Sequence, residues 1–454
     1  MTDARSAAAF DRRLLAPMVL GSILNPVNSS LIAVALVPIG MALGAPASQT
    51  AWLVSGLYLA TAVGQPVTGR LVDLYGPRPL YLVGTALVGI GGVLGVVAPD
   101  IGTLTAARVV IGLGTCAGYP AAMALVRREA DRTGRDSPES VLTALSVSTQ
   151  TIAVVGPTLG GLLIGLGGWR TTFAVNVPLA VVALAVGWWA MPRALGRERS
   201  SDSVVSLVDP LGIGLFTAAL VSLLLVLERP SWWPLAAVTV VAGAALVRWE
   251  LRARHPFLDL RVLAGNGPLL LTFLRALLGA TVSYAILYGY TQWLEQGRGL
   301  SASAAGLALL PIFLAGIGVA ALTGRRREIR GKLLVGAAGQ VVLAVLLLFL
   351  SSASPIWLLV VVALVAGVPQ GLNNLAVQNA VYRQADPERV ASSAGLMRTF
   401  FYLGAIVAGT TGGLAYSGGA TTQGLHVLAF VMLGAAMVFL LVTVLDRSLV
   451  RLEA

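Results

Sequence analysis

The chain has 454 residues, of which 57% are hydrophobic and 11% are charged, and its mean hydropathy is +0.84. One water-soluble globule cannot bury that much apolar surface, so the composition excludes a soluble protein and predicts an integral membrane protein. The formal net charge of +11 does not indicate nucleic-acid binding, because the basic residues gather in loops on one predicted side of the membrane.

Runs of about 20 apolar residues, the length with which a helix crosses roughly 30 Å of hydrocarbon, recur along the whole chain. No loop between them is long enough to form a soluble catalytic or nucleotide-binding domain. The sequence therefore predicts an all-α protein with fourteen transmembrane helices, over residues 15–42, 51–69, 80–98, 102–126, 141–166, 171–191, 208–228, 231–248, 268–293, 303–323, 332–351, 356–381, 391–416 and 424–445.

The distribution of Lys and Arg predicts the orientation of these helices. With a cytosolic amino terminus, the eight cytosolic segments hold 25 of the 31 basic residues and the outer loops hold three. This bias places both termini in the cytosol and indicates the inner (cytoplasmic) membrane, where clusters such as residues 325–327 contact anionic lipid. The amino-terminal segment has no signal-peptide cleavage site, so the first span is predicted to be retained.

Spacing and loop composition predict three parts of the chain. Residues 1–194 form an amino-terminal six-helix bundle, and residues 263–454 form a carboxy-terminal one. Residues 195–262 are a linker with two inserted transmembrane helices, which follows the charged segment RALGRERSSDS (193–203). A faint repeat supports two similar halves, because GRLVDLYGPRPL (69–80) has a degenerate copy, GRRREIRGKLLV (324–335), after the second span of each half.

Several classes of chemistry have no support in the sequence. There is no GxxxxGK[ST] motif, so ATP is not the expected energy source. Two histidines and one cysteine offer no metal site, no disulfide within the chain and no catalytic constellation. We therefore expect neither an enzyme nor a protein that needs a metal or cofactor.

The loop GRLVDLYGPR (69–78) resembles the signature between spans 2 and 3 of the major facilitator superfamily of transporters. Gly69 and Gly76 permit a tight turn, while Asp73 can cap a helix terminus and Arg78 can pair with it. The resemblance implies a gating loop, a cytosolic latch that holds the two halves together in one state. The alternative is an ordinary charged turn.

Further stretches resemble the fourteen-span drug:proton antiporter branch of this superfamily. VVGPTLGG (154–161) is similar to its antiporter motif, LTAARVVIGLG (104–114) to its Arg-bearing fourth span, and WRTTFAVNVP (169–178) and LSASAAGLALLP (300–311) to two other segments. In the antiporter motif, small residues allow close helix packing and a proline bends the span; these residues are Gly156, Pro157, Gly160 and Gly161. Packing alone would also explain that motif.

Two predicted spans carry amide side chains on one helical face. In the first span Asn25 and Asn28 are three residues apart, and in the twelfth Gln370, Asn373 and Asn374 follow positions i, i+3 and i+4. An amide that faces lipid leaves hydrogen bonds unmade, so these faces are predicted to point at protein or at a water-filled cavity. Substrate contact is the preferred interpretation, and interhelical hydrogen bonding is the alternative.

Three arginines lie inside predicted spans, at Arg108, Arg275 and Arg398, the last of them one turn before Tyr402. A charge at that depth is costly and is by default a functional hypothesis. We predict anion contact or a charge network, with snorkelling to the interface as the alternative. Glu295, at the outer end of the ninth span, is a candidate proton acceptor.

No acid lies in the first span, where the fourteen-span antiporters usually carry one. Three intramembrane arginines without a midplane acid favour an anionic or zwitterionic substrate, and they leave the coupling ion open.

The sequence thus predicts a major facilitator fold of two six-helix bundles plus two inserted helices. Its predicted function is secondary active export of a small organic molecule, a drug-like compound or a metabolite, by alternating access with proton antiport. An uncoupled facilitator or an importer is the alternative, and a non-transporting sensor is a third hypothesis. We expect a monomer in the lipid bilayer that binds no nucleic acid.

Overall fold

The computed structural model describes residues 10–45, 47–50, 52–133, 139–193, 208–228, 230–258, 260–300, 302–324, 326, 328–416 and 419–451. Within these ranges every regular element is a helix, in agreement with the predicted all-α class. The chain divides into two compact units. Unit 1 comprises Met1–Ser203 together with Ala385–Gly395, and unit 2 comprises Val204–Gln384 together with Leu396–Ala454. The prediction of two six-helix bundles with an inserted pair stays a prediction.

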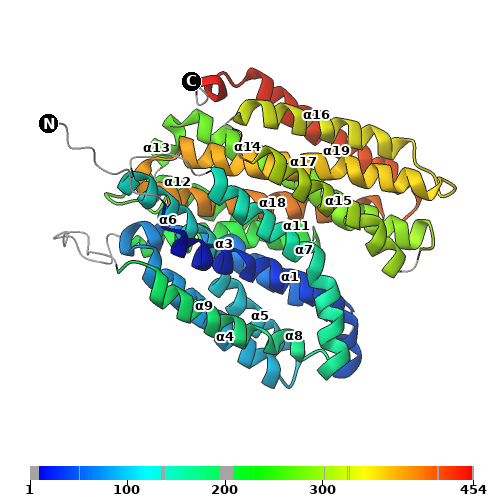
Figure 1. Ribbon diagram of the computed structural model, residues 1–454, viewed down its shortest axis with the longest axis horizontal. Coiled ribbons are helices and arrows are strands. Elements are labelled where there is room, and N and C mark those ends of the chain that lie inside the picture. Colours follow the sequence, from blue (N-terminus) through cyan, green and yellow to red (C-terminus); the bar gives the residue numbers. More distant parts are fainter. Residues whose placement is uncertain are drawn as a thin grey trace. The chain divides into compact units, whose positions relative to one another are not determined.

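Unit 1 is built around α1, which packs along α7, and around α4, which lies between α5 and α9 (Figure 1). Its interior contains Leu57, Ile111 and Phe173, none more than 2% exposed. The helices of this unit are η1 (Arg12–Leu14), α1 (Leu15–Leu43), α2 (Ala47–Thr50), α3 (Trp52–Tyr75), α4 (Pro77–Val97), α5 (Ile101–Thr115), α6 (Gly118–Thr133), α7 (Glu139–Gly167), α8 (Thr171–Ala174), α9 (Asn176–Ala190) and η5 (Pro387–Arg389).

Unit 2 contains the layered helices α15, α17, α16 and α19, each of which packs on the next (Figure 1). Its interior includes Trp293, Leu347 and Met432, all fully buried. Its helices are α11 (Pro210–Glu228), η2 (Pro230–Trp232), α12 (Leu235–Glu250), α13 (Leu260–Gly265), α14 (Gly267–Tyr284), η3 (Ala285–Tyr290), η4 (Trp293–Gly297), α15 (Ala302–Thr323), α16 (Ile329–Leu348), α17 (Ile356–Gln384), α18 (Val390–Ala415), whose first turn belongs to unit 1, α19 (Thr422–Leu445) and α20 (Ser448–Arg451).

In the described part of the chain, eleven helical segments are long and apolar enough to cross a membrane. The predicted spans 51–69, 208–228 and 231–248 correspond to α3, α11 and α12, which are not among the eleven. α12 is 16 residues long and is therefore too short for the full hydrocarbon thickness. A multi-span membrane protein is confirmed, whereas the number fourteen is not.

Two predicted spans are irregular in ways that the apolar pattern did not reveal. The ninth span continues from α14 into two π-helical segments, η3 and η4. The fourth span is divided into α5 and α6, and the break places Gly118 directly against the backbone of Gly21 in α1. A Cβ atom at Gly118 would lie 2.1 Å from the Gly21 carbonyl oxygen, so this close approach requires glycine.

Candidate functional site

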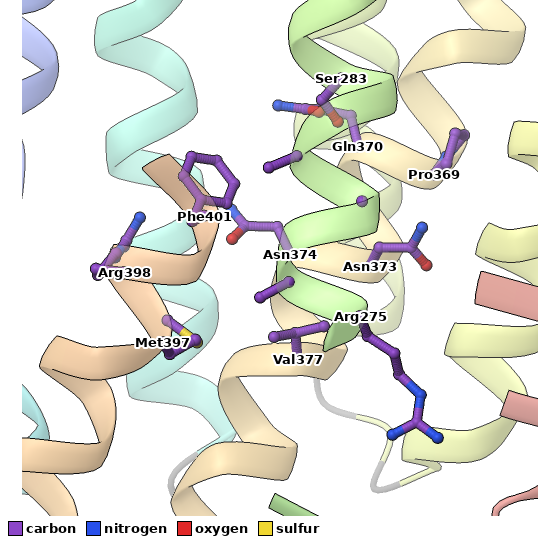
Figure 2. A pocket seen from close by; sticks show the side chains of 13 residues that line it. Arg275, Ser283, Pro369, Gln370, Asn373, Asn374, Val377, Met397, Arg398 and Phe401 are labelled. Atoms are coloured by element: carbon purple, nitrogen blue, oxygen red, sulfur yellow. The ribbon is translucent and has the colours of Figure 1, made fainter. Parts of the chain in front are cut away.

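Unit 2 contains a pocket between α14, α17 and α18, with about 480 Å³ of space between its lining atoms, part of it open to the surroundings (Figure 2). Its lining brings together five of the predicted site residues, which are Arg275, Gln370, Asn373, Asn374 and Arg398. Sequence reasoning did not select the other lining side chains, among them Ser283, Met397 and Phe401. None of the lining residues is an aspartate or a glutamate.

The amides of α17 divide between two sides of the helix. Figure 2 shows Asn374 on the same side as Phe401 and Arg398, whereas Asn373 points to the opposite side. Asn374 accepts a hydrogen bond of 2.8 Å from Gln378 Nε2, and its side chain is half-buried. Asn373 is 6% exposed. Both residues line one pocket, but their amides point in different directions and do not form the single face that helical spacing predicts.

The cation that accompanies these amides is Arg398 of α18. Its guanidinium carbon lies 5.8 Å from the ring centroid of Phe401, a cation–π geometry. Phe401 is three residues after Arg398, and the helical spacing that suggested Tyr402 applies to it equally. Tyr402 itself is 5% exposed, packs edge-on against Phe401 and does not line this pocket.

Arg275 contributes its stem to the pocket, while its charged end is directed elsewhere. Figure 2 shows the guanidinium pointing away from Gln370 and Asn374. It forms an ion pair with Asp446 Oδ2 at 2.7 Å and donates to the carbonyl oxygen of Val442 at 3.1 Å. The side chains of Arg275 and Asp446 are 0% and 4% exposed. This pair links α14 to the carboxyl end of α19.

Asp446 was not selected from the sequence because it follows the last apolar run. Burial acts to raise the pKa of this carboxyl group, but hydrogen bonds from Ser448 and Arg275 outweigh it and hold the pKa below its ordinary value of 3.8. The carboxylate is therefore charged at neutral pH. One feature of the sequence could have suggested this ion pair. Arg275 and Asp446 both lie toward the predicted cytosolic ends of their spans.

In unit 1, Arg108 of α5 is buried at 2% exposure. Its Nε donates to the Leu53 carbonyl at 2.7 Å and its Nη1 donates to the Asn28 carbonyl at 3.2 Å. Among the described residues no carboxylate pairs with it. The guanidinium thus joins α5 to α3 and α1 through backbone acceptors, and its predicted role in a charge network stays a prediction.

The amide face of α1 makes hydrogen bonds inside unit 1. Asn28 Nδ2 donates to Asn176 Oδ1 of α9 at 2.7 Å and to the Leu24 carbonyl at 2.9 Å. Asn25 Nδ2 donates to Thr115 Oγ1 at 3.1 Å. The bonds to Asn176 and Thr115 are interhelical, the bond to Leu24 lies within α1, and substrate contact by either amide stays a prediction. Asn176 was not selected because nothing in the sequence pairs it with Asn28.

The segment predicted as a gating loop is helical except at Gly76, and the last turn of α3 carries a carboxylate that binds the start of α18 within unit 1. Asp73 accepts from the backbone nitrogens of Ala391 and Ser392, at 3.1 and 2.9 Å, and from the Ser392 hydroxyl group. Burial raises the pKa of Asp73 to about 6, although these hydrogen bonds oppose the rise. A Cβ atom at Gly69 would lie 2.5 Å from the Ala391 carbonyl oxygen, so glycine is required there.

The other two members of this loop differ in how the structure uses them. Gly76 has a φ of 86°, a conformation that favours glycine, and it begins α4. Arg78 does not pair with Asp73 as the sequence suggested. It donates to the Trp188 carbonyl at 2.8 Å, and its guanidinium lies 4.9 Å from the Trp188 ring centroid.

The VVGPTLGG segment lies in α7, where it packs against α1. A Cβ atom at Gly156 would lie 1.9 Å from Ser30 Oγ, and one at Gly160 would lie 2.7 Å from Val34 Cγ2. Pro157 is inside the helix, while Gly161 has open space around it. Close helix packing thus uses Gly156 and Gly160, and an antiporter role stays a prediction.

Glu295, the candidate proton acceptor, is half-buried in the π-helical segment η4. Proton uptake by Glu295 stays a prediction.

The sequence matches the family model described as "Major Facilitator Superfamily" over residues 18–409. The chain belongs to this superfamily. A relative described as the uncharacterized MFS-type transporter YwoD, from Bacillus subtilis (strain 168), is 30% identical over 459 residues, which cover 99% of each chain.

Two further matches extend this comparison. The multidrug resistance protein Stp of Mycobacterium tuberculosis (strain CDC 1551 / Oshkosh) is 32% identical over 291 residues, which are 60% of this chain and 51% of that protein. A crystal structure described as the human organic anion transporter MFSD10 (TETRAN) has a TM-score of 0.69 at 15% identity, covering 95% of this chain and 99% of the other, and shows the same fold.

This major facilitator is therefore a multi-span membrane transporter that acts on small molecules, and it is not an enzyme. Its bacterial relatives indicate the plasma membrane as its location.

Proposed function

We propose that this major facilitator exports a small organic anion across the cytoplasmic membrane by alternating access, with proton antiport and with both termini in the cytosol. The observation that carries the proposal is the charge of the pocket in unit 2. Arg398 supplies a cation, Gln370 and Asn374 supply neutral hydrogen-bonding groups, and no acid lines the pocket. A carboxylate would be paired there, whereas a lipophilic cation would have no counter-charge.

We infer the roles of Arg275 and Arg398 from the groups that their guanidinium groups contact. Arg275 already has a carboxylate partner, so in our proposal it fixes α14 to α19 and contributes only its stem to the pocket. Arg398 lies beside an aromatic face, which suits an anion that also carries an aromatic or apolar body. Tyr402 packs edge-on against the Phe401 ring and in our proposal helps to hold that ring in place.

Two resemblances support export rather than import, one to a sequence motif and one to a relative. The α7 segment that contains Gly156 and Gly160 is similar to an antiporter motif, and the relative Stp is named a multidrug resistance protein. We assign Glu295 as the proton acceptor and Arg108 to the charge network of unit 1. We assign the gating function to the loop of Gly69, Asp73, Gly76 and Arg78, because Asp73 binds the first turn of α18.

The test is ligand-induced thermal stabilisation of the purified protein. Benzoate and 2-naphthoate are compared with tetraphenylphosphonium, on the wild type, on Arg398→Gln and on Arg248→Gln. A ligand that binds only the folded state raises the unfolding temperature by mass action. We expect the two anions to stabilise the wild type and Arg248→Gln, but not Arg398→Gln. Arg248 is an exposed residue of α12 and controls for the loss of one positive charge.

Stabilisation by tetraphenylphosphonium alone, unchanged in Arg398→Gln, would overturn the anionic assignment. Coupling is tested separately in inside-out vesicles, where an imposed pH gradient, acid inside, should drive uptake of the stabilising anion. Glu295→Gln should abolish that dependence.

An uncoupled facilitator is the second candidate, and one observation favours it. In the first span, where related antiporters usually carry an acid, this chain has Asn25 and Asn28. Their amide groups do not take up protons, and they make hydrogen bonds to Thr115 and Asn176. This candidate predicts flux that follows the substrate gradient in both directions, and a protonophore would change it only through the membrane potential.

A further inference from the structure

Asn373 is an unusual member of the pocket lining because its amide has no hydrogen-bond partner. The side chain is 6% exposed, and neither Nδ2 nor Oδ1 is bonded within the described residues. Its neighbour Asn374 differs, since it accepts from Gln378 and is half-buried. Asn373 therefore presents one donor group and one acceptor atom, both unused, at the wall of a pocket.

The surroundings of Asn373 are shaped to receive its amide. A Cβ atom at Gly336 of α16 would lie 1.9 Å from Asn373 Oδ1 and 3.1 Å from Asn373 Nδ2. Any side chain at position 336 would displace the Asn373 amide. The glycine at this position of α16 therefore leaves the space that the Asn373 amide occupies. Glycine inside a helix is destabilising relative to alanine, so the space for the amide has an energetic cost.

A second unsatisfied amide lies on the same face of α16, one turn beyond Gly336. Gln340 is 1% exposed, and its Oε1 has no hydrogen-bond partner within the described residues. Gln340 Nε2 is 3.9 Å from the position that a Cβ atom of Gly279 would occupy, and Gly279 lines the pocket from α14. Asn373 lines the pocket from α17, and Gln340 of the neighbouring helix α16 lies next to the lining residue Gly279.

Leaving these groups unpaired is costly. A buried donor or acceptor without a partner loses its hydrogen bond to water and gains none in return, and buried polar groups in folded proteins nearly always have a partner. Leucine at either position would avoid that cost. Arg275, a cation of the pocket lining, is not available as an ionic partner, because it is already paired with Asp446. A neutral group that both donates and accepts hydrogen bonds suits an amide, which has both kinds of atom.

We propose that Asn373 and Gln340 form a neutral polar subsite of the pocket, which receives a carboxamide or a similar donor–acceptor group of the transported ligand. This proposal rests on the proposed function in one respect, because it takes this pocket as the substrate site. It does not depend on the charge of the substrate. A resident water molecule has the same hydrogen-bonding capacity, and the experiment separates it from the ligand group.

The experiment measures the affinity of the purified protein for two probes of similar size, 4-carbamoylbenzoate and 4-isopropylbenzoate. Only the first can donate and accept hydrogen bonds at its distal end. We expect the wild type to bind 4-carbamoylbenzoate about tenfold more tightly, which corresponds to one good hydrogen-bonded group. Asn373→Leu is expected to reduce that preference to about twofold or less, and Gln340→Leu to reduce it in part.

A matched control comes from the same helix. Asn379 is 3% exposed and its Oδ1 also has no partner within the described residues, but it does not line the pocket. Asn379→Leu should keep the wild-type preference. The unliganded Asn373→Leu protein should unfold at the wild-type temperature or above, since an unsatisfied amide has been removed, and this excludes misfolding as the cause of a lost preference.

Equal affinity of the wild type for the two probes, or binding of neither, would overturn the subsite and leave water as its occupant. A preference that survives Asn373→Leu would overturn it as well. Benzamide and isopropylbenzene form an uncharged pair that separates this result from the proposed function. If the carboxylate probes bind no better than the uncharged ones, the anionic assignment fails, while the amide preference and its loss in Asn373→Leu still support the subsite.

Discussion

Arg275 and Asp446 form a buried ion pair whose Nη2 to Oδ2 distance is 2.7 Å, although 171 residues separate them in the sequence. The pair joins α14, a wall of the pocket, to the end of α19. A guanidinium that was predicted to contact substrate thus has a carboxylate partner inside its own unit. Arg398 is the pocket cation that lies beside the aromatic ring of Phe401.

Removing one partner of this pair should destabilise the protein. Arg275→Ala leaves a buried carboxylate uncompensated, and breaking such a pair costs about 3 to 5 kcal/mol. We expect a markedly lower unfolding temperature in detergent, with much of the loss recovered in Arg275→Met/Asp446→Leu, where neither charge remains. Equal stability of Arg275→Ala and the wild type would show that the pair contributes little.

The same pair predicts an acid limit to stability. The pKa of Asp446 lies below 3.8 in the folded protein, so its stabilising contribution is complete above the unfolded value and is lost as the pH falls through the folded one. Below about pH 4 the gap in unfolding temperature between the wild type and Asp446→Asn should close. A gap that stays constant down to pH 3 would contradict this linkage.

Asp73 should show the opposite linkage. Its pKa is raised to about 6, so between the ordinary value of 3.8 and that pH the folded state binds more protons than the unfolded state. The free energy of unfolding therefore falls as the pH rises through this window. Asp73→Asn, which cannot ionise, should unfold at a higher temperature than the wild type at pH 7.5 and at the same temperature near pH 4.

Asp386 gives the matched control for this measurement. It is an exposed aspartate that accepts a hydrogen bond from the Glu388 backbone nitrogen at 2.9 Å, in the same Ala385–Gly395 segment. Asp386→Asn should show no gain at pH 7.5. A stability difference for Asp73→Asn that does not change with pH would exclude titration of Asp73 as its cause.

The contact between α1 and α7 predicts a contrast between two glycines. Gly156→Ala places a methyl group onto Ser30 Oγ, and overpacking of this kind costs about 1 to 3 kcal/mol. Gly161→Ala meets nothing within 4 Å and should be neutral. Thermal unfolding and transport are both measured, and similar behaviour of the two variants would mean that α1 and α7 do not pack as described.

Asn28 offers a test between its two interpretations. Asn28→Ala leaves Asn176 Oδ1 without its donor from α1, so the unfolding free energy should fall by about 1 to 3 kcal/mol while ligand affinity is kept. Unchanged stability with a large loss of ligand affinity would instead establish the amide as a substrate contact.

Much of the architecture follows from local properties of the sequence. The apolar runs and sparse charges identify a helical membrane protein, because a bilayer forces each span to satisfy its own backbone hydrogen bonds. The Gly-rich loop at residues 69–78 and the α7 segment identify the superfamily, because short motifs are readable without knowing which helices meet. Helical spacing also brought Gln370, Asn373 and Asn374 to one pocket.

Only the tertiary structure decided which polar groups bind each other. Asp73 with Ser392, Asn28 with Asn176 and Arg275 with Asp446 are separated by 319, 148 and 171 residues. Each pairing depends on how two helices are rotated about their axes and shifted along them. The spacing of residues within one helix carries no information about the neighbouring helix. For the same reason the sequence could show that Asn373 and Asn374 belong to a polar face, but not that one points toward Arg398 and the other toward Gly336.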